Sequence, residues 1–255
     1  MAEPVTQPVT AQAEEHHYKP HVYSYKPVGD EATAKQLGAD AAWAAELIEK
    51  LTHAGGDEAM KPGIVNACEG LAFVKASKGG LGVTMARGHG FVIRKLDQDR
   101  TGNSRWSAPV YFQVNQMGIG LSAGYETSET IIAFMSFSSV LNFVGGHSGM
   151  GTDLGLVSTE GAMCGVPAGT FGTSTHMDVQ ADNSNASFCY SLSHGLLANV
   201  SITGTETHPD KTLNDKLYGE ATALNDVLQG RTDTFHELHT LYHKIAETGR
   251  KAIEP

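Results

Sequence analysis

Two stretches of this chain place chemically active side chains at spacings close to catalytic motifs. The segment 146–150 reads Gly-His-Ser-Gly-Met, which places Ser148 as the serine of a nucleophile elbow. Met150 stands where that turn needs its second glycine, so the strained geometry of the elbow is not expected. The segment 236–239 reads His-Glu-Leu-His and is one residue shorter than the helical zinc-protease motif. Neither stretch predicts catalysis.

Three histidines do share one side of the helix expected over residues 232–248. His236, His239 and His243 are spaced i, i+3 and i+7 beside an apolar face of Phe235, Leu238, Tyr242 and Ile245. The favoured interpretation is a solvated stripe beside the apolar face, and a metal-binding or pH-sensing role is the alternative. The three cysteines are scattered and odd in number, which favours core positions in a reducing compartment over disulfides. We expect no metal and no cofactor.

Basic side chains are concentrated in one part of an acidic chain. Residues 61–105 contain eight basic and three acidic residues, although the net charge of the chain is −10. An island of this size is too short for double-stranded nucleic acid, which needs several phosphate contacts. It does suit an anionic membrane surface, and ion pairing within the protein is the alternative use of these charges. The candidate lipid-binding residues are Lys61, Lys75, Lys78, Arg87, Arg94 and Lys95.

A helix expected over residues 30–53 would lie next to this island. Asp30 can cap it, and Leu37, Ala41, Ala44, Ile48 and Leu51 form one apolar stripe. The stripe can pack on the domain or lie in a membrane interface with Leu37, Ile48 and Leu51 inserted. Interfacial helices usually carry many Lys and Arg on their polar face, whereas this helix is near neutral. Packing is therefore the favoured prediction.

The rest of the chain predicts strands around a central stretch, residues 106–125. Val110, Phe112 and Val114 alternate with polar residues, as in a half-buried strand, and a glycine-rich segment follows. Further strands are expected, with glycine, Asn and Asp between them, over residues 81–95, 129–135, 154–157, 161–166, 186–190 and 196–202. Short helices are expected over 137–144 and from Leu213. The prediction is an α+β fold with an antiparallel β-sheet at its centre and helices at the N- and C-terminal ends.

The domain boundaries follow from composition. Residues 1–29 contain four prolines and a polar run rich in His and Tyr, so they are expected to form a disordered leader. Residues 30–255 are expected to form a single domain. No apolar run approaches the roughly 18 residues needed to cross a bilayer, and no signal pattern begins the chain. A cytoplasmic protein, peripheral at the endosomal or plasma membrane, is the expectation.

A series of short motifs resembles the SYLF domain, found in yeast actin-patch proteins and in vertebrate proteins with a C-terminal Src-homology domain. The resemblance covers roughly residues 35–250. It depends on motifs that occur together and in order, which are Pro62 to Ala67, Gly70-Leu71-Ala72, Lys78-Gly79-Gly80, Trp106-Ser107-Ala108-Pro109, Gly118-Ile119-Gly120 with Gly124, Gly165-Val166-Pro167, Tyr190 with Gly195 to Ala198, and Asn214 with Tyr218-Gly219.

The resemblance implies a peripheral module that binds phosphoinositides or other anionic lipids and serves endocytosis or membrane traffic. In its fungal branch it also implies actin-filament binding, so a cytoskeletal regulator is the second function class. An enzyme is the third and ranks lowest, because no acid, base and nucleophile converge in the sequence. The expected partners are anionic membrane lipids and actin filaments, without nucleic acid.

Overall fold

An antiparallel sheet forms the centre of the molecule, as predicted. The computed structural model describes residues 24–53, 59–145, 170–177 and 186–253. The sheet order among them is β3–β2–β4–β6–β5, and every neighbouring pair is antiparallel. The strands are β2 (Gly70–Gln98), β3 (Ser104–Trp106), β4 (Val110–Phe134), β5 (Thr170–Met177) and β6 (Ala186–Pro209). With helices at both chain ends, the α+β prediction is confirmed.

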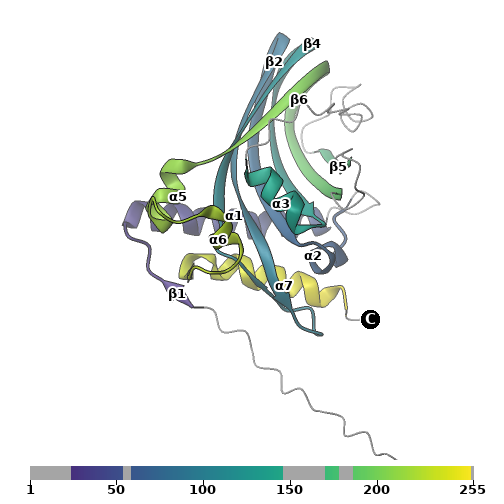
Figure 1. Cartoon of the computed structure of the whole chain (residues 1–255). Helices are drawn as coiled ribbons and strands as arrows, with labels where there is room; N and C mark the ends of the chain where they lie inside the picture. The colour runs from purple at the N-terminus through teal and green to yellow at the C-terminus, as the bar shows by residue number, and fades with distance from the viewer. Residues whose placement is uncertain (1–23, 54–58, 146–169, 178–185, 254–255) are drawn as a thin grey trace, which may run out of the picture.

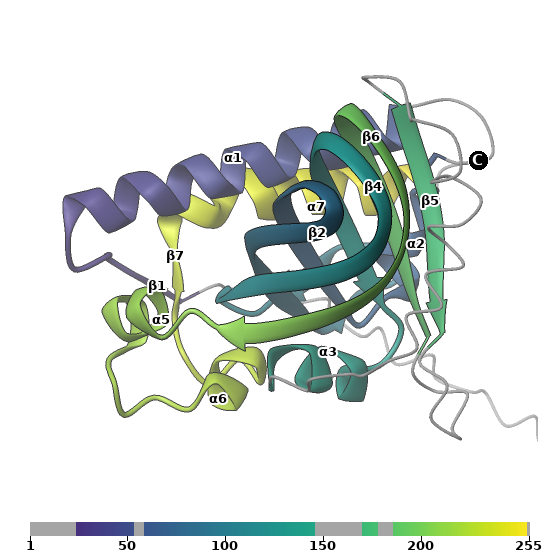
Figure 2. The same ribbon diagram turned by 90° about the horizontal axis from the view of Figure 1, so that it is seen from above.

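Helices cover the two faces of this sheet (Figures 1 and 2). On one face, α1 packs beside α7, and the Tyr111 hydroxyl of β4 donates to Asp40 of α1. On the other face, Phe143 of α3 packs against Phe112 and Phe134 of β4. The sheet curves around α3. The helices are α1 (Glu31–His53), α2 (Gly63–Ala67), α3 (Phe137–Val144), α5 (Lys211–Tyr218), α6 (Leu224–Leu228) and α7 (His239–Lys251).

The three central strands are much longer than predicted. The segments expected as separate strands merge into β2, β4 and β6, which have 29, 25 and 24 residues. Glycines do not interrupt these strands: Gly88 and Gly90 lie inside β2, opposite Val114 and Phe112, and at the bend of the two strands Gly80 pairs directly with Gly124. An irregularity also lies there, because three residues of β4, 120–122, stand opposite Gly82. The predicted strands 154–157 and 161–166 lie outside the described residues.

The bend brings the two ends of β2 together. The Lys95 amide donates to the Glu69 carbonyl at 2.9 Å, and the rings of Phe73 and Phe91 are 5.2 Å apart. The backbones approach so closely that a Cβ on Gly90 would lie 1.9 Å from the Phe73 carbonyl oxygen. Glycine is therefore required at position 90 for steric reasons, although its φ angle is ordinary.

The predicted N-terminal helix is present with its predicted cap. Thr33 donates its amide to the Asp30 carboxylate at 2.8 Å, and α1 then runs to His53. The whole predicted stripe is buried in the main core. The helix therefore packs on the domain, as the favoured prediction had it. No helix in the described part of the chain is long and apolar enough to cross a membrane.

Two chain-end predictions need correction. The leader was expected to be disordered through residue 29, but β1 (Tyr25–Lys26) pairs in parallel with β7 (Thr234–Phe235). The ammonium of Lys26 donates to the Leu217 carbonyl at 3.0 Å and lies over the rings of Tyr218 and Phe235. These contacts explain the ordering, while residues 1–23 lie outside the described part. The C-terminal helix begins at His239, because β7 and the 3-10 turn η1 (His236–Leu238) occupy its predicted start.

Candidate functional site

The Trp106-Ser107-Ala108-Pro109 segment is built into the core. The side chain of Trp106 is 1% exposed, in agreement with the central role given to it by the sequence. The Ser107 hydroxyl accepts from the Arg94 amide at 2.9 Å and donates to the Ala108 carbonyl at 2.9 Å. The Ser107 carbonyl accepts the hydroxyl proton of Tyr242 from α7. The segment therefore ties β2 and β3 to the C-terminal helix.

A second motif, Asn214 with Tyr218 on α5, reaches the same strands. The Asn214 side chain accepts from the Tyr111 amide at 2.9 Å and donates to the Tyr111 carbonyl at 2.8 Å. The Tyr218 hydroxyl donates to the Pro109 carbonyl at 2.5 Å. Asn214 thus acts as an extra strand partner for β4. We call residues 106–109, 111, 214, 218 and 242 the clasp, since they hydrogen-bond helices α5 and α7 to the strand ends.

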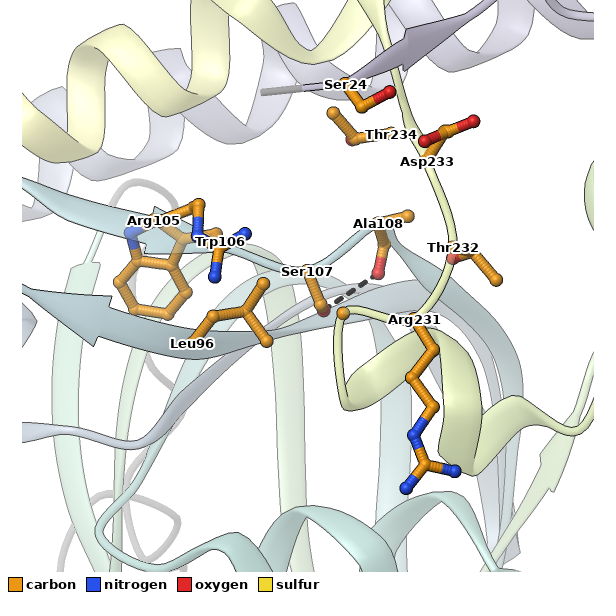
Figure 3. Close-up of a pocket in the computed structure, with 11 residues that line it drawn as sticks. Ser24, Leu96, Arg105, Trp106, Ser107, Ala108, Arg231, Thr232, Asp233 and Thr234 are labelled. Carbon is orange, nitrogen blue, oxygen red and sulfur yellow. Dashed lines mark hydrogen bonds between the residues drawn. The ribbon is translucent and has the colours of Figure 1, made fainter. Parts of the chain in front are cut away.

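A small pocket opens beside the clasp (Figure 3). It has a volume of about 140 Å³ between β3 and the segment leading into β7. Arg105 and Arg231 line it, but each is held by a carboxylate, Asp97 at 3.1 Å and Asp226 at 2.6 Å. The hydroxyl of Ser107 is engaged by backbone, and no histidine or cysteine is among the lining residues. The pocket therefore offers no activated nucleophile.

A half-buried acid lies between α1 and the sheet. Asp40 accepts the Tyr111 hydroxyl at 3.0 Å, and burial raises the pKa of the Asp40 carboxyl, with Lys75 and His89 opposing the rise. Burial, reinforced by the charge of Asp40, also raises the pKa of Tyr111. Tyr111 therefore remains a protonated donor, and the pair fixes α1 to β4.

Lys75, a predicted lipid-binding residue, is engaged by α1. Its ammonium lies 4.2 Å from the centre of the Trp43 ring, and it stands opposite Glu129 on β4. The indole nitrogen of Trp43 donates to the Glu129 carboxylate at 2.7 Å. Trp43, outside the predicted apolar stripe, thus covers one member of the basic island.

The other predicted basic residues lie on both faces of β2 or, in the case of Lys61, outside it. Lys95 is buried, donates to the Asn66 carbonyl at 2.9 Å, and has its pKa lowered by burial. The guanidinium of Arg94 lies 3.9 Å from the centre of the Phe137 ring on the α3 face. Lys78 stands opposite Glu126. Arg87 is exposed in β2, and Lys61 is exposed before α2. The structure therefore does not gather these six residues into one patch.

The predicted membrane-helix residues are inaccessible while α1 stays docked. Leu37, Ile48 and Leu51 are 1%, 0% and 2% exposed and belong to the main core. Any contact of these side chains with lipid requires α1 to leave the sheet and α7.

The histidine row is solvent-exposed. His236, His239 and His243 are all exposed, His236 stacks on Tyr25, and the other two rings lie 6.3 Å apart. No group of three or more metal-ligating side chains is placed to hold an ion within the described residues. Cys68 and Cys189 are buried thiols, and burial raises the pKa of Cys68 to about 12. Cys164 and Ser148 lie outside the described residues.

Sequence reasoning missed one surface, at the bend of the sheet. Leu81, Met85 and Tyr125 are 86%, 49% and 60% exposed. Their positions continue the alternation of apolar residues in β2 and β4, and that pattern predicts buried side chains. Periodicity therefore could not identify these three residues as exposed. The available signal was the glycines around them, because a strand segment rich in glycine lacks the side chains that build a core.

Comparison with known proteins identifies the family. The family model described as "Ysc84: Las17-binding protein actin regulator" matches residues 115–248. The human SH3 domain-containing YSC84-like protein 1 is 28% identical over 210 residues, which cover 81% of this chain and 57% of that protein. The Xenopus laevis protein of the same name is 29% identical over 181 residues, covering 69% of this chain and 50% of the relative.

A yeast relative matches over a similar region. Protein YSC84 of Saccharomyces cerevisiae is 28% identical over 179 residues, which cover 69% of this chain and 35% of that protein. The chain thus spans about half the length, or less, of these relatives. No solved structure matches it. The motif series and the family model agree, and this chain belongs to the Ysc84 (SYLF-domain) family.

Proposed function

We propose that this chain binds anionic membrane lipid, phosphoinositides included, as a peripheral component of actin-linked endocytosis or membrane traffic. One observation carries the proposal. From Gly70 to Leu96 the chain has five basic residues and no Asp or Glu, although its net charge is −10. β2 runs through this whole segment, and Arg87 and His89 are exposed on it. A basic side chain near an anionic surface contributes about 1 kcal/mol.

The placement of the basic residues limits the expected affinity. Lys95 is buried, and Lys75 is held under Trp43, so fewer charges face solvent than the sequence offers. A few exposed charges alone give weak, salt-dependent binding, because each attraction is screened within a Debye length of about 10 Å. Association should therefore depend strongly on salt and on Arg87.

The test is co-sedimentation of the full chain with phosphatidylcholine vesicles, with and without phosphatidylserine or a phosphoinositide, at low and high salt. Arg87→Glu should weaken binding to the anionic vesicles about tenfold. Arg100→Glu is the matched control, because Arg100 is exposed in the turn after β2. Binding that ignores salt and Arg87→Glu would contradict the proposal.

The double reversal Lys75→Glu with Lys78→Glu is a less clean test. It should abolish binding, but Lys75→Glu would place a second carboxylate beside Glu129 and remove the cation over Trp43. Loss of binding in that variant needs a folding control such as circular dichroism.

The family description favours a second candidate, actin-filament binding. A relative named LAS seventeen-binding protein 3 matches 69% of this chain at 28% identity. Actin filaments are acidic and could meet the same basic surface. Co-sedimentation with actin filaments and, separately, with vesicles shows which of the two partners the chain binds. If it binds both, Arg87→Glu weakens filament binding only when the two partners share the basic surface.

A further inference from the structure

Exposed apolar side chains gather at the bend of the sheet. Four large hydrophobic side chains among those described are well exposed, and three of them, Leu81, Met85 and Tyr125, lie in β2 and β4 near the bend. The fourth, Ile253, lies near the C-terminus. At the top of Figure 1, β2 and β4 rise beyond every described helix. A cluster of exposed apolar side chains at a projecting tip usually marks a surface that binds a partner or a membrane.

The strand register places these side chains on one face. Tyr125 stands opposite Gly79, and Leu81 is two residues further along β2, which makes Leu81 and Tyr125 diagonal neighbours. Leu81 and Met85 share a face of β2 because they are four residues apart in one strand. Glycine at position 79 places no side chain opposite the Tyr125 ring.

Charge on the same face suits an anionic layer. Arg87 and His89 follow Met85 at two-residue steps, so they share its face, and both are exposed. Lys75 also lies on this face, closer to α1. Two acids of β4 are nearby. Glu126 stands opposite Lys78 one position away, and Glu129, which lies on this face opposite Lys75, accepts the indole proton of Trp43. Apolar side chains and an amphipathic Tyr bordered by Arg87 and Lys75 match the boundary between headgroups and acyl chains.

We propose that the bend is the part of this protein that enters the lipid surface, with Leu81, Met85 and Tyr125 inserted and Arg87 at the headgroups. The inference rests on the proposed lipid-binding function. It assigns insertion to the sheet and leaves α1 docked, because Leu37, Ile48 and Leu51 are core residues. The bend needs no rearrangement to meet a bilayer, whereas release of α1 would open the core.

The experiment compares three forms of the full chain on phosphatidylcholine vesicles with and without phosphatidylserine. Leu81→Ser with Tyr125→Ser should weaken binding to the anionic vesicles about tenfold or more, since two apolar side chains no longer leave water. Ile253→Ser is the matched control, because Ile253 is 51% exposed but distant in sequence from the bend. It should bind as the wild type does. Circular dichroism and thermal midpoints check that all three fold alike.

A fluorescent probe reports insertion independently of affinity. In a Cys164→Ser background, Leu81→Cys carries a polarity-sensitive dye, and the other two cysteines are buried. The dye at position 81 should shift to the blue on anionic vesicles, and a dye on Ile253→Cys should not. The inference is overturned if the wild type binds anionic vesicles, the bend double variant binds them equally well, and the dye at position 81 shows no blue shift. The proposed lipid-binding function would still stand after that result.

Two other outcomes also decide the matter. If the wild type ignores anionic vesicles altogether, the proposed function fails, and the inference fails with it. If the wild type forms a dimer without vesicles and the bend double variant does not, the patch joins two copies of this chain. That result overturns the lipid assignment.

Discussion

The two regions of the β2–β4 ladder, at the clasp and at the bend, differ in almost every physical respect. At the clasp, helices α5 and α7 hydrogen-bond to the strands through Asn214, Tyr218 and Tyr242, and Trp106 is buried. At the bend, glycines replace side chains, and Leu81 and Tyr125 are exposed. One sheet thus combines a hydrogen-bonded anchor with a tip that no described helix covers. Substitutions at the clasp should therefore affect stability, and substitutions at the bend should affect binding.

The largest effect is expected from Trp106→Ala. Removing this fully buried ring should lower the free energy of unfolding by about 3–5 kcal/mol, the usual size for such truncations. Denaturant unfolding followed by circular dichroism measures it. Trp43→Ala, at the half-buried second tryptophan, should cost clearly less. Equal costs for the two variants would contradict the account of the clasp.

Asn214→Ala should come next, at about 1–3 kcal/mol. The change leaves the buried amide of Tyr111 without its partner, and an unsatisfied buried group costs about 1–3 kcal/mol, whereas the Tyr111 carbonyl keeps the bond from the Asp210 amide at 2.9 Å. Thermal unfolding against the control Asn142→Ala, an exposed residue of α3, isolates this loss. A variant as stable as the control would show that Asn214 does not hold β4.

Gly90→Ala tests the close approach between the two halves of β2. The added Cβ meets the Phe73 carbonyl at 1.9 Å, so the two halves of β2 must separate, at a cost of about 1–3 kcal/mol or more. At Gly63 nothing lies within 4 Å of the new Cβ, and Gly63→Ala should be neutral or slightly stabilising. Equal melting temperatures for the two would contradict the close approach.

The smallest effect is expected at Asp40. Because burial raises its folded-state pKa above 3.8, its contribution to stability is full below 3.8 and falls as the pH rises through the folded pKa. Asp40→Asn keeps an acceptor for Tyr111 and should raise the thermal midpoint near neutral pH by about 2 °C. The gain should disappear on acidification below 3.8. A loss of stability at neutral pH would show that the charge is favourable there.

Local signals predicted α1 and α3 well. Asp30 and the stripe from Leu37 to Leu51 located α1, and α3 has the predicted bounds 137–144. These elements follow from capping and periodicity, which are properties of neighbouring residues. The lengths of β2, β4 and β6 were missed, because glycine inside a strand and glycine in a turn look alike in sequence. The bend is decided by how distant segments pair.

The candidate site was predicted less well for the same reason. The basic island is visible in the sequence, but burial of Lys95 and coverage of Lys75 by Trp43 depend on contacts between distant segments. Leu81 reads as a core residue from its apolar type. Its exposure follows from the reach of the helices, since no described helix extends to the bend (Figure 1). Hydropathy alone does not carry that information.

Hydrogen exchange of the full chain with and without phosphatidylserine vesicles tests most directly whether the bend meets lipid. The account predicts slower exchange on binding in peptides around residues 79–87 and 123–127, with exchange in α1 unchanged. Faster exchange in α1, together with no change at the bend, would show that the helix leaves the core to meet the membrane and would contradict the account.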